Sequence, residues 1–453
     1  MLKKIAVAVV IAIFFSVGAW AEEEAATVEK KVPSFAGRLR NIPDFLLKNK
    51  REGHYFTAFP AIGVDPDTGF NIGAFMQFFN NKKKSDPFFE ITPYRSTLQV
   101  GGIVTTNKVF QLYGYFDSPF VFDSPWRVRS EAQLFYNPLA NYFGIGSAGQ
   151  QLIFPGSGQV YSSYDSYKNA LKVQSGGETN EDYDLYKYTN TFWRNSAEYN
   201  LVGGWIRLLG GFQISHTWIE DYTGKTVSGA LQRTTHLEED CSAGRAIGCR
   251  GGWDNFVKLG IVFDTRDFEP DPDIGIMWEG VFEYAPKILG SSSNYGRLST
   301  SIRGFGKIFE IGGQKLIAAN RFFYQSQFGD IPFYAMSSMG FTDLDRSGLG
   351  GFQTLRGYVL NRFIGPVTIL NSSELRYSIY EFNVLHQHLK LGIKPFLDLG
   401  RAFDKVADTS FQNWHVDGGI GLMLAWNIAT VISFDQAWSS EGSSFYMTLG
   451  AQF

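Results

Sequence analysis

The sequence predicts an all-β protein: a transmembrane antiparallel β-barrel of about sixteen strands, with a lid loop folded into its lumen. From His54 onward, apolar and polar residues alternate over many short segments, as in strands with one lipid-facing side. Only 19% of the 453 residues are charged, whereas 16% are aromatic, a balance that suits an apolar outer surface. The mean hydropathy of −0.12 excludes a bundle of transmembrane helices.

The first 21 residues predict a secretory signal peptide. Lys3 and Lys4 form a basic start, residues 5–17 form an apolar core, and residues 19–21 (AWA) supply a cleavage pattern of small residues. This segment carries two lysines and no acidic residue, so its removal changes the formal net charge from −3 to −5. A charge this small argues against a nucleic-acid partner.

Residues 22–53 are expected to form a short periplasmic leader, and residues 54–453 the barrel. The leader is acidic at first and then basic, and its apolar residues have the spacing of a short amphipathic helix. A disordered tail is the alternative. Within the leader, residues 34–50 either plug the lumen or bind a separate periplasmic partner.

Sixteen segments show the alternating pattern, an even number as in single-chain bacterial barrels. They are residues 54–64, 69–80, 87–104, 108–117, 127–137, 184–199, 204–220, 254–266, 274–286, 295–308, 313–327, 366–382, 388–400, 415–426, 429–438 and 444–453. A soluble sandwich also has strands with one apolar face. Sixteen successive strands favour closure of the sheet within lipid.

The three longest connections, residues 138–183, 221–253 and 328–365, all follow odd-numbered strands. If the N-terminus is periplasmic, these connections lie outside the cell, which is the asymmetry of outer-membrane barrels. This places Cys241 and Cys249 on the cell surface. In an exported protein a local disulfide between them is the leading interpretation, because a metal site would need more ligands.

The sequence predicts neither an enzyme nor a bound cofactor or metal. It contains no HExxH motif, no GxSxG, no P-loop and no glycine-rich loop opening a helix. A Ser–His hydrolase hidden in the barrel wall is the remaining alternative. Asp264, Arg266 and Asp267 are either catalytic or, as we expect, a structural charge cluster at a periplasmic turn.

Leu355-Arg356-Gly357-Tyr358 is the segment expected to hold the lid loop in the lumen. Arginine presents a planar fork of five donors that suits carboxylates. Strand alternation places Glu374 and Asp398 on polar faces of neighbouring strands, where they could bind Arg356 together. The alternative is a solvated arginine in a surface loop.

Several motifs resemble, in order, those of the BamA/TamA-type outer-membrane insertase superfamily, also called the bacterial surface antigen family. They are NYFGIG (141–146), FDTRD (263–267), LRGY (355–358), NSSELRY (371–377) and FLDLG (396–400). The resemblance covers residues 54–453 and implies a sixteen-stranded barrel with the lid loop inside. The family usually carries periplasmic capture domains before the barrel, and this sequence shows none.

The resemblance also implies a location and partners. It places the chain in the outer membrane of a Gram-negative-type bacterium, in contact with lipid and lipopolysaccharide. The terminal Phe453 is similar to the aromatic residue that marks barrels for insertion by the barrel assembly machinery. The function expected from the resemblance is assistance in the assembly or transport of outer-membrane proteins or lipids. A passive or substrate-selective pore is the alternative.

Overall fold

The computed structural model describes residues 33, 35, 50–267, 271–343, 345–384, 387–426 and 430–449. The predicted signal peptide, nearly all of the leader with its predicted helix, and Phe453 lie outside the described residues. No helix in the described part of the chain has the length and apolarity needed to cross a membrane.

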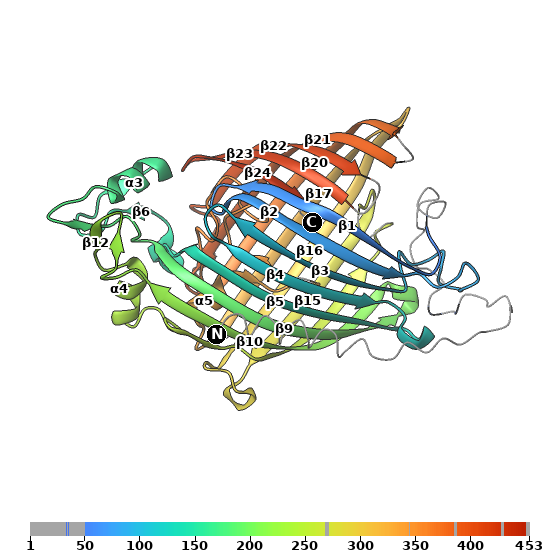
Figure 1. Ribbon diagram of the computed structural model, residues 1–453, viewed down its shortest axis with the longest axis horizontal. Helices are drawn as coiled ribbons and strands as arrows, with labels where there is room; N and C mark the ends of the chain where they lie inside the picture. The colour runs from blue at the N-terminus through green and yellow to red at the C-terminus, as the bar shows by residue number, and fades with distance from the viewer. Residues whose placement is uncertain are drawn as a thin grey trace.

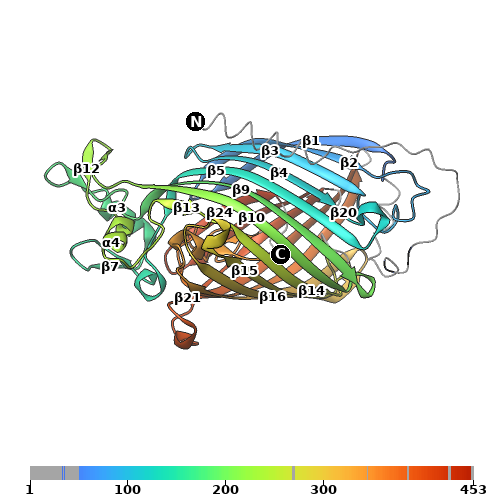
Figure 2. The same ribbon diagram turned by 90° about the horizontal axis from the view of Figure 1, so that it is seen from below.

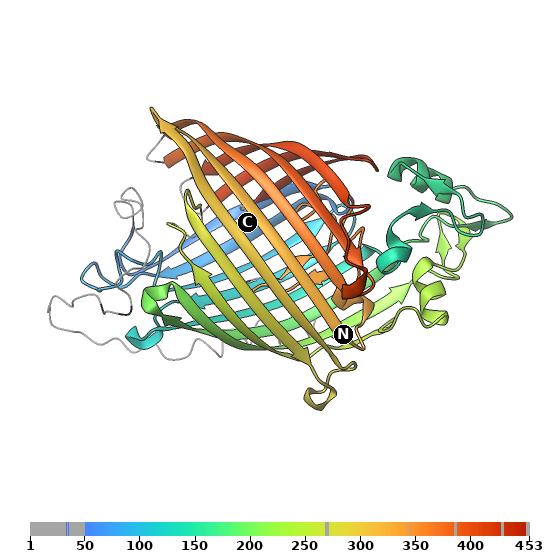
Figure 3. The same cartoon turned by 180° about the vertical axis from the view of Figure 1, so that it is seen from behind.

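Sixteen long antiparallel strands close into a barrel, as predicted (Figures 1 and 3). They are β1 (His54–Asp65), β2 (Gly69–Asn80), β3 (Ser96–Thr105), β4 (Phe110–Ser118), β5 (Trp126–Asn141), β9 (Leu185–Leu201), β10 (Ile206–Asp221), β14 (Phe256–Asp264), β15 (Gly275–Ala285), β16 (Tyr295–Ile311), β17 (Gln314–Gly329), β20 (Val367–Val384), β21 (Gln387–Phe403), β22 (His415–Trp426), β23 (Thr430–Ser439) and β24 (Ser443–Leu449). Each strand pairs with the next, and β1 pairs with β24 to close the barrel. The three-residue β13 (Gly251–Trp253) pairs with β10 beside β14.

The third strand is shorter than the sequence pattern indicates. We expected it to begin at residue 87, but β3 begins at Ser96. Asp86 is the cause, because its side chain accepts the backbone N–H of Phe88 at 2.9 Å and its carbonyl accepts that of Phe89 at 3.0 Å. These bonds, with Pro87, form a turn before the strand.

The strands alternate between an apolar outer face and a polar inner face. In β14 the outward Leu259 is 60% exposed, whereas Lys258 beside it points inward and is buried. Leu208 on β10 and Phe282 on β15 continue the exposed apolar surface. A soluble protein does not leave such an apolar belt in water, so the surface requires lipid around it.

The three longest connections pack against one another at one end of the barrel (Figure 2). Their short elements are β6 (Leu152–Ile153), β7 (Val160–Tyr161), α3 (Tyr164–Leu171), β8 (Glu178–Thr179), β11 (Thr226–Val227), β12 (Ala230–Gln232), α4 (His236–Ser242), α5 (Phe333–Met336), β18 (Ser338–Met339) and β19 (Arg346–Ser347). The Tyr142 hydroxyl donates to Asp240 at 2.6 Å and joins the first connection to the second. A parallel bridge between Ile145 and Ile364 joins the first to the third.

The opposite end of the barrel receives the described part of the leader. The ring of Phe35 packs against those of Phe88 and Phe120, with centroids 6.3 and 6.0 Å apart. Lys50 donates to the carbonyls of Phe89 and Thr92, the latter at 2.6 Å. These described residues therefore contact the rim turns of the barrel.

The outward apolar face predicts how a charge would act there. We expect Leu259→Arg, near the middle of β14, to lower the free energy of unfolding in lipid vesicles by ~2–4 kcal/mol. The matched control is Ile311→Arg at the end of β16, which should cost ~0–1 kcal/mol because its charge reaches the interface. Urea titration followed by tryptophan fluorescence measures both, and equal effects would contradict the lipid-facing assignment of β14.

Candidate functional site: a lid loop bound to opposite walls of the lumen

The lid loop is the connection 330–366 between β17 and β20, and its tip is folded around glycines. Gly350 and Gly351 have φ values of +107° and +91°, a region that other residues rarely adopt. A Cβ on Gly350 would lie 2.0 Å from the carbonyl oxygen of Val359. Thr354 accepts the N–H of Gly350 at 2.9 Å and donates to the carbonyl of Gly348 at 2.8 Å. This compact turn positions the LRGY segment against the wall.

Arg356 lies between the two carboxylates named from the sequence. Its Nε and Nη2 donate to the two oxygens of Asp398 at 2.7 and 3.0 Å, and its Nη1 donates to Glu374 Oε1 at 2.9 Å. The guanidinium carbon also lies 3.4 Å from the ring centre of Phe396. The Arg356 side chain is fully buried, so the charge is neutralised by the wall and not by water.

Further charged groups complete this carboxylate cluster. Asp435 on β23 lies 3.6 Å from Arg356 Nη1, and Lys394 on β21 lies 3.0 Å from Asp435. Arg376 Nε donates to Glu374 at 2.9 Å. Burial alone would lower the pKa of Arg356, but Asp398 and Glu374 outweigh it and raise the pKa above its usual range. The guanidinium therefore remains charged at any physiological pH.

The other three residues of the LRGY segment pack the lid loop against the barrel wall. Gly357 lies so close to the wall that a Cβ would be 2.7 Å from the Cβ of Asp417. Leu355 is buried in an apolar cluster that includes Phe323 and Leu370 of the wall. The Tyr358 hydroxyl lies 3.2 Å from the Ser440 hydroxyl, in the turn before β24.

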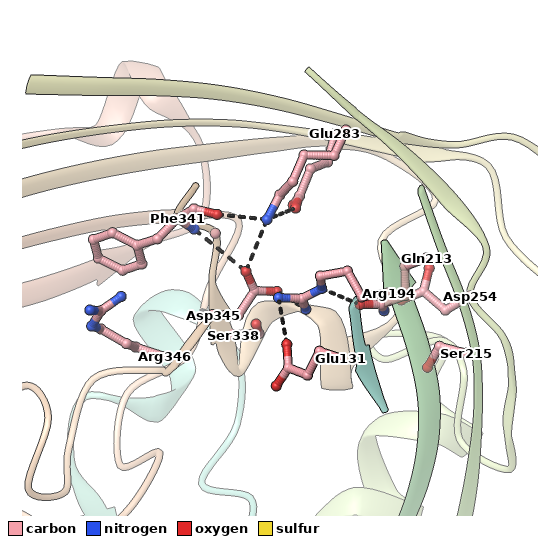
Figure 4. Close-up of polar contacts among 12 residues, drawn as sticks. Glu131, Arg194, Gln213, Ser215, Asp254, Glu283, Ser338, Phe341, Asp345 and Arg346 are labelled. Atoms are coloured by element: carbon pink, nitrogen blue, oxygen red, sulfur yellow. Dashed lines mark hydrogen bonds and ion pairs between the residues drawn. The ribbon is translucent and has the colours of Figure 1, made fainter. Parts of the chain in front are cut away.

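A second cluster binds the lid loop to the other side of the lumen (Figure 4). Here the lid supplies the carboxylate and the wall supplies the cations. Asp345 accepts from Arg194 on β9 at 2.8 Å, from Arg297 on β16 at 3.3 Å and from Lys258 on β14 at 3.4 Å. Burial would raise the pKa of Asp345, but these three cations hold it well below its usual range. The sequence offered a partial signal, because alternation places Lys258 on the polar face of its strand.

Two more lid residues contact the strands that close the barrel. The backbone N–H of Leu360 donates to Asp67 at 2.8 Å, in the turn after β1. Arg362 donates to both oxygens of Glu441 at 2.8 and 2.9 Å, in the turn before β24. Burial and the neighbouring Asp65 raise the pKa of Asp67 to about 7. The lid loop thus contacts both sides of the seam between β1 and β24.

The remaining predicted residues lie apart from the lid contacts. Arg266 donates to Asp264 at 2.9 Å, and Arg207 on β10 does so at 3.2 Å. Asp267 accepts the backbone N–H of Asp273 at 3.0 Å. These contacts hold the end of β14 against the turn that follows it, as a structural charge cluster does.

Cys241 and Cys249 form a disulfide between α4 and the segment before β13. Both cysteines pack against the apolar cluster shared by the long connections. Among the described residues, no group of three or more His, Cys, Asp or Glu side chains is placed to hold a metal ion.

Comparisons with known proteins agree with this architecture. The model of the Omp85 superfamily domain matches residues 106–453, and a domain of unknown function, DUF5982, matches residues 33–95. The barrel is similar to a crystal structure of BamA from Haemophilus ducreyi lacking POTRA domains 1–3, with 12% identity, a TM-score of 0.52 and coverage of 88% of this chain and 70% of that one. It is also similar to CdiB from Escherichia coli, with 10% identity, a TM-score of 0.50 and coverage of 90% and 69%.

A search of curated protein sequences found no match. The family match nevertheless spans more than half of the chain, and the fold of the two solved structures agrees with it. The predicted resemblance is therefore confirmed at the level of the family. This chain belongs to the Omp85 superfamily of outer-membrane β-barrel proteins.

Proposed function

We propose that this barrel assists the assembly or transport of proteins or lipids at the outer membrane, by releasing its lid loop and opening its seam. The observation that carries the proposal is the position of the lid. It contacts Asp67 on one side of the seam and Glu441 on the other, through residues only two apart in sequence. Movement of the lid therefore removes a bridge across the seam.

The seam itself supports the proposal. Within the described residues, β1 and β24 share one Cα pair, Val64 with Met447, whereas β1 and β2 share twelve. Each cross-strand side-chain pair contributes roughly 0.2–1 kcal/mol to a sheet. The described part of the β1–β24 ladder therefore resists separation less than the ladder beside it.

A pore is the second candidate, and one observation favours it. A cavity of about 760 Å³ lies in the lumen beside the lid loop. Release of the lid would join this space to the exterior and let small solutes cross. In the closed arrangement described here, the lid loop occupies part of the lumen, which favours a gated pathway over an open channel.

We also propose partners at the two ends of the barrel. The apolar belt fits outer-membrane lipid, with lipopolysaccharide at the end that carries the long connections. The aromatic contact of Phe35 with Phe88 and Phe120 places this leader residue at the opposite rim. A separate periplasmic protein would meet the chain there. The barrel assembly machinery inserts this barrel into the membrane and recognises Phe453 as the signal.

The first prediction of the proposed function concerns Arg356. Arg356→Ala leaves Glu374 and Asp398 without their main cation, a loss of ~3–5 kcal/mol for a buried pair. We expect higher conductance in planar bilayers and greater antibiotic uptake by cells. Arg250→Ala is the control, because the Arg250 side chain is 75% exposed in a surface connection. Unchanged conductance at normal barrel levels would show that Arg356 does not hold the lid.

The second prediction concerns Asp345. Asp345→Asn removes the carboxylate by which the lid binds three wall cations, although Lys258 and Arg297 keep Glu283. The other end of the lid should therefore loosen and conductance should rise. Asp408→Asn is the control at an exposed turn. If both clusters hold one rigid loop, the double variant with Arg356→Ala should show less than the summed effect on conductance. Full additivity would indicate two independently moving segments.

The third prediction tests the function itself. Val64→Cys with Met447→Cys should lock the seam by a disulfide, and cells relying on this variant should lose outer-membrane proteins or lipid asymmetry. Reductant should restore both. Ala58→Cys with Met76→Cys locks the β1–β2 ladder instead, whose residues are also register partners, and should have no effect. A locked seam with normal outer-membrane composition would refute the proposed function.

A further inference from the structure

The cavity in the lumen lies apart from the Arg356 cluster and reaches the seam. It is bounded by the inner faces of β1 to β5, β9 and β10 on one side and by the lid loop on the other. Gly63 and Val64 of β1 and Met447 and Thr448 of β24 line its seam end. A volume of about 760 Å³ falls in the range of small-molecule binding sites.

The seam end of the cavity carries an apolar patch, beside the polar residues Asp65, Asn71 and Thr448 that also line it. Phe59 and Ala61 of β1 alternate with outward residues and point inward. Phe75 of β2 is the register partner of Phe59, and their ring centroids lie 5.8 Å apart. Phe352 of the lid loop lines the same cavity. Barrel interiors are usually polar, so aromatic rings here indicate an apolar occupant.

Away from the seam, amide side chains line the cavity. Gln99, Gln111 and Gln133 line it on β3, β4 and β5, and Gln111 donates to Gln133 at 2.8 Å. Glu131 and Arg194, which form an ion pair at 3.8 Å, also line the cavity (Figure 4). Phe135, Phe192 and Phe256 also line this part of the cavity, so amide and charged groups lie there among aromatic rings.

We infer that this cavity binds an amphiphile, with an acyl chain against Phe59 and Phe75 and a polar head group against the amides and the charged wall. The seam end of the cavity gives the acyl chain a route from the membrane into the lumen. Strands β2 to β5 use their backbone groups in ladders with their neighbours, so an extended peptide would find few free backbone partners on that part of the wall. An apolar patch and hydrogen-bonding groups within one cavity favour a lipid instead.

This inference rests on the proposed function, because it names a lipid as the cargo of the same barrel. It is tested on the purified full chain in vesicles, with no client protein present. A phosphatidylethanolamine carrying a diazirine at the end of its acyl chain is the probe. After irradiation, mass spectrometry maps the labelled residues. We expect label on the inward Phe59 and Phe75, in addition to the outward Ile72 and Phe78.

A matched pair of variants on one strand sharpens the test. Ala61→Trp fills the cavity and should abolish the inward label, whereas Ala58→Trp points to lipid and should leave it unchanged. If Ala61→Trp loses the electrophoretic mobility of the folded barrel, Phe59→Ser and Phe75→Ser serve as the test variants instead. These two variants should also abolish the inward label.

Two results would overturn the inference. One is label confined to outward residues of the wild-type protein. The other is displacement of the inward label by a synthetic peptide of alternating apolar and polar residues, which would assign the cavity to protein segments. Either result leaves the proposed function standing if the locked seam still blocks assembly, so the two failures are distinguishable.

Discussion

The buried contact of Arg356 with Asp398 and Glu374 is the constraint on which the arrangement of the lumen depends. A guanidinium without access to water is stable only if fixed carboxylates replace its hydration. The wall supplies them from β20 and β21, and the glycine turn at Gly350 brings the arginine to them. Such a pair adds little net stability, because desolvation offsets most of the attraction. Its physical consequence is a single defined position for the loop.

The second cluster explains why the loop lies across the lumen and not along one wall. Asp345 needs cations, and Arg194, Lys258 and Arg297 lie on β9, β14 and β16. Arg356 needs anions, which lie on β20 and β21. A lid turned the other way would move Arg356 from its carboxylates to a wall with three cations, where Glu283 and Glu131 are already paired with them. The ion pairs at the two ends therefore hold the loop in the orientation that the structure shows.

The barrel was predictable because apolar and polar residues alternate along its strands. This alternation depends only on which face of each strand meets lipid. The same rule assigned Glu374 and Asp398 to inner faces, and the structure places Arg356 between them. Asp345 could not be predicted, because it lies in an irregular loop. Such a loop has no strand alternation from which the direction of a side chain can be inferred. The early start expected for β3 failed for a related reason: turn bonds to Asp86 override the apolar pattern.

The lid links the seam to the cavity through neighbouring residues. Phe352 lines the cavity, and Leu360 and Arg362 contact the turns beside β1 and β24. Coupling between two sites requires one element with two arrangements that both sites bias. Under the proposed function, the lid bound at both ends is this element, and its two arrangements are bound and released. An occupant that packs on Phe352 and on the inner face of β1 changes the energy of the closed lid and of the closed seam together.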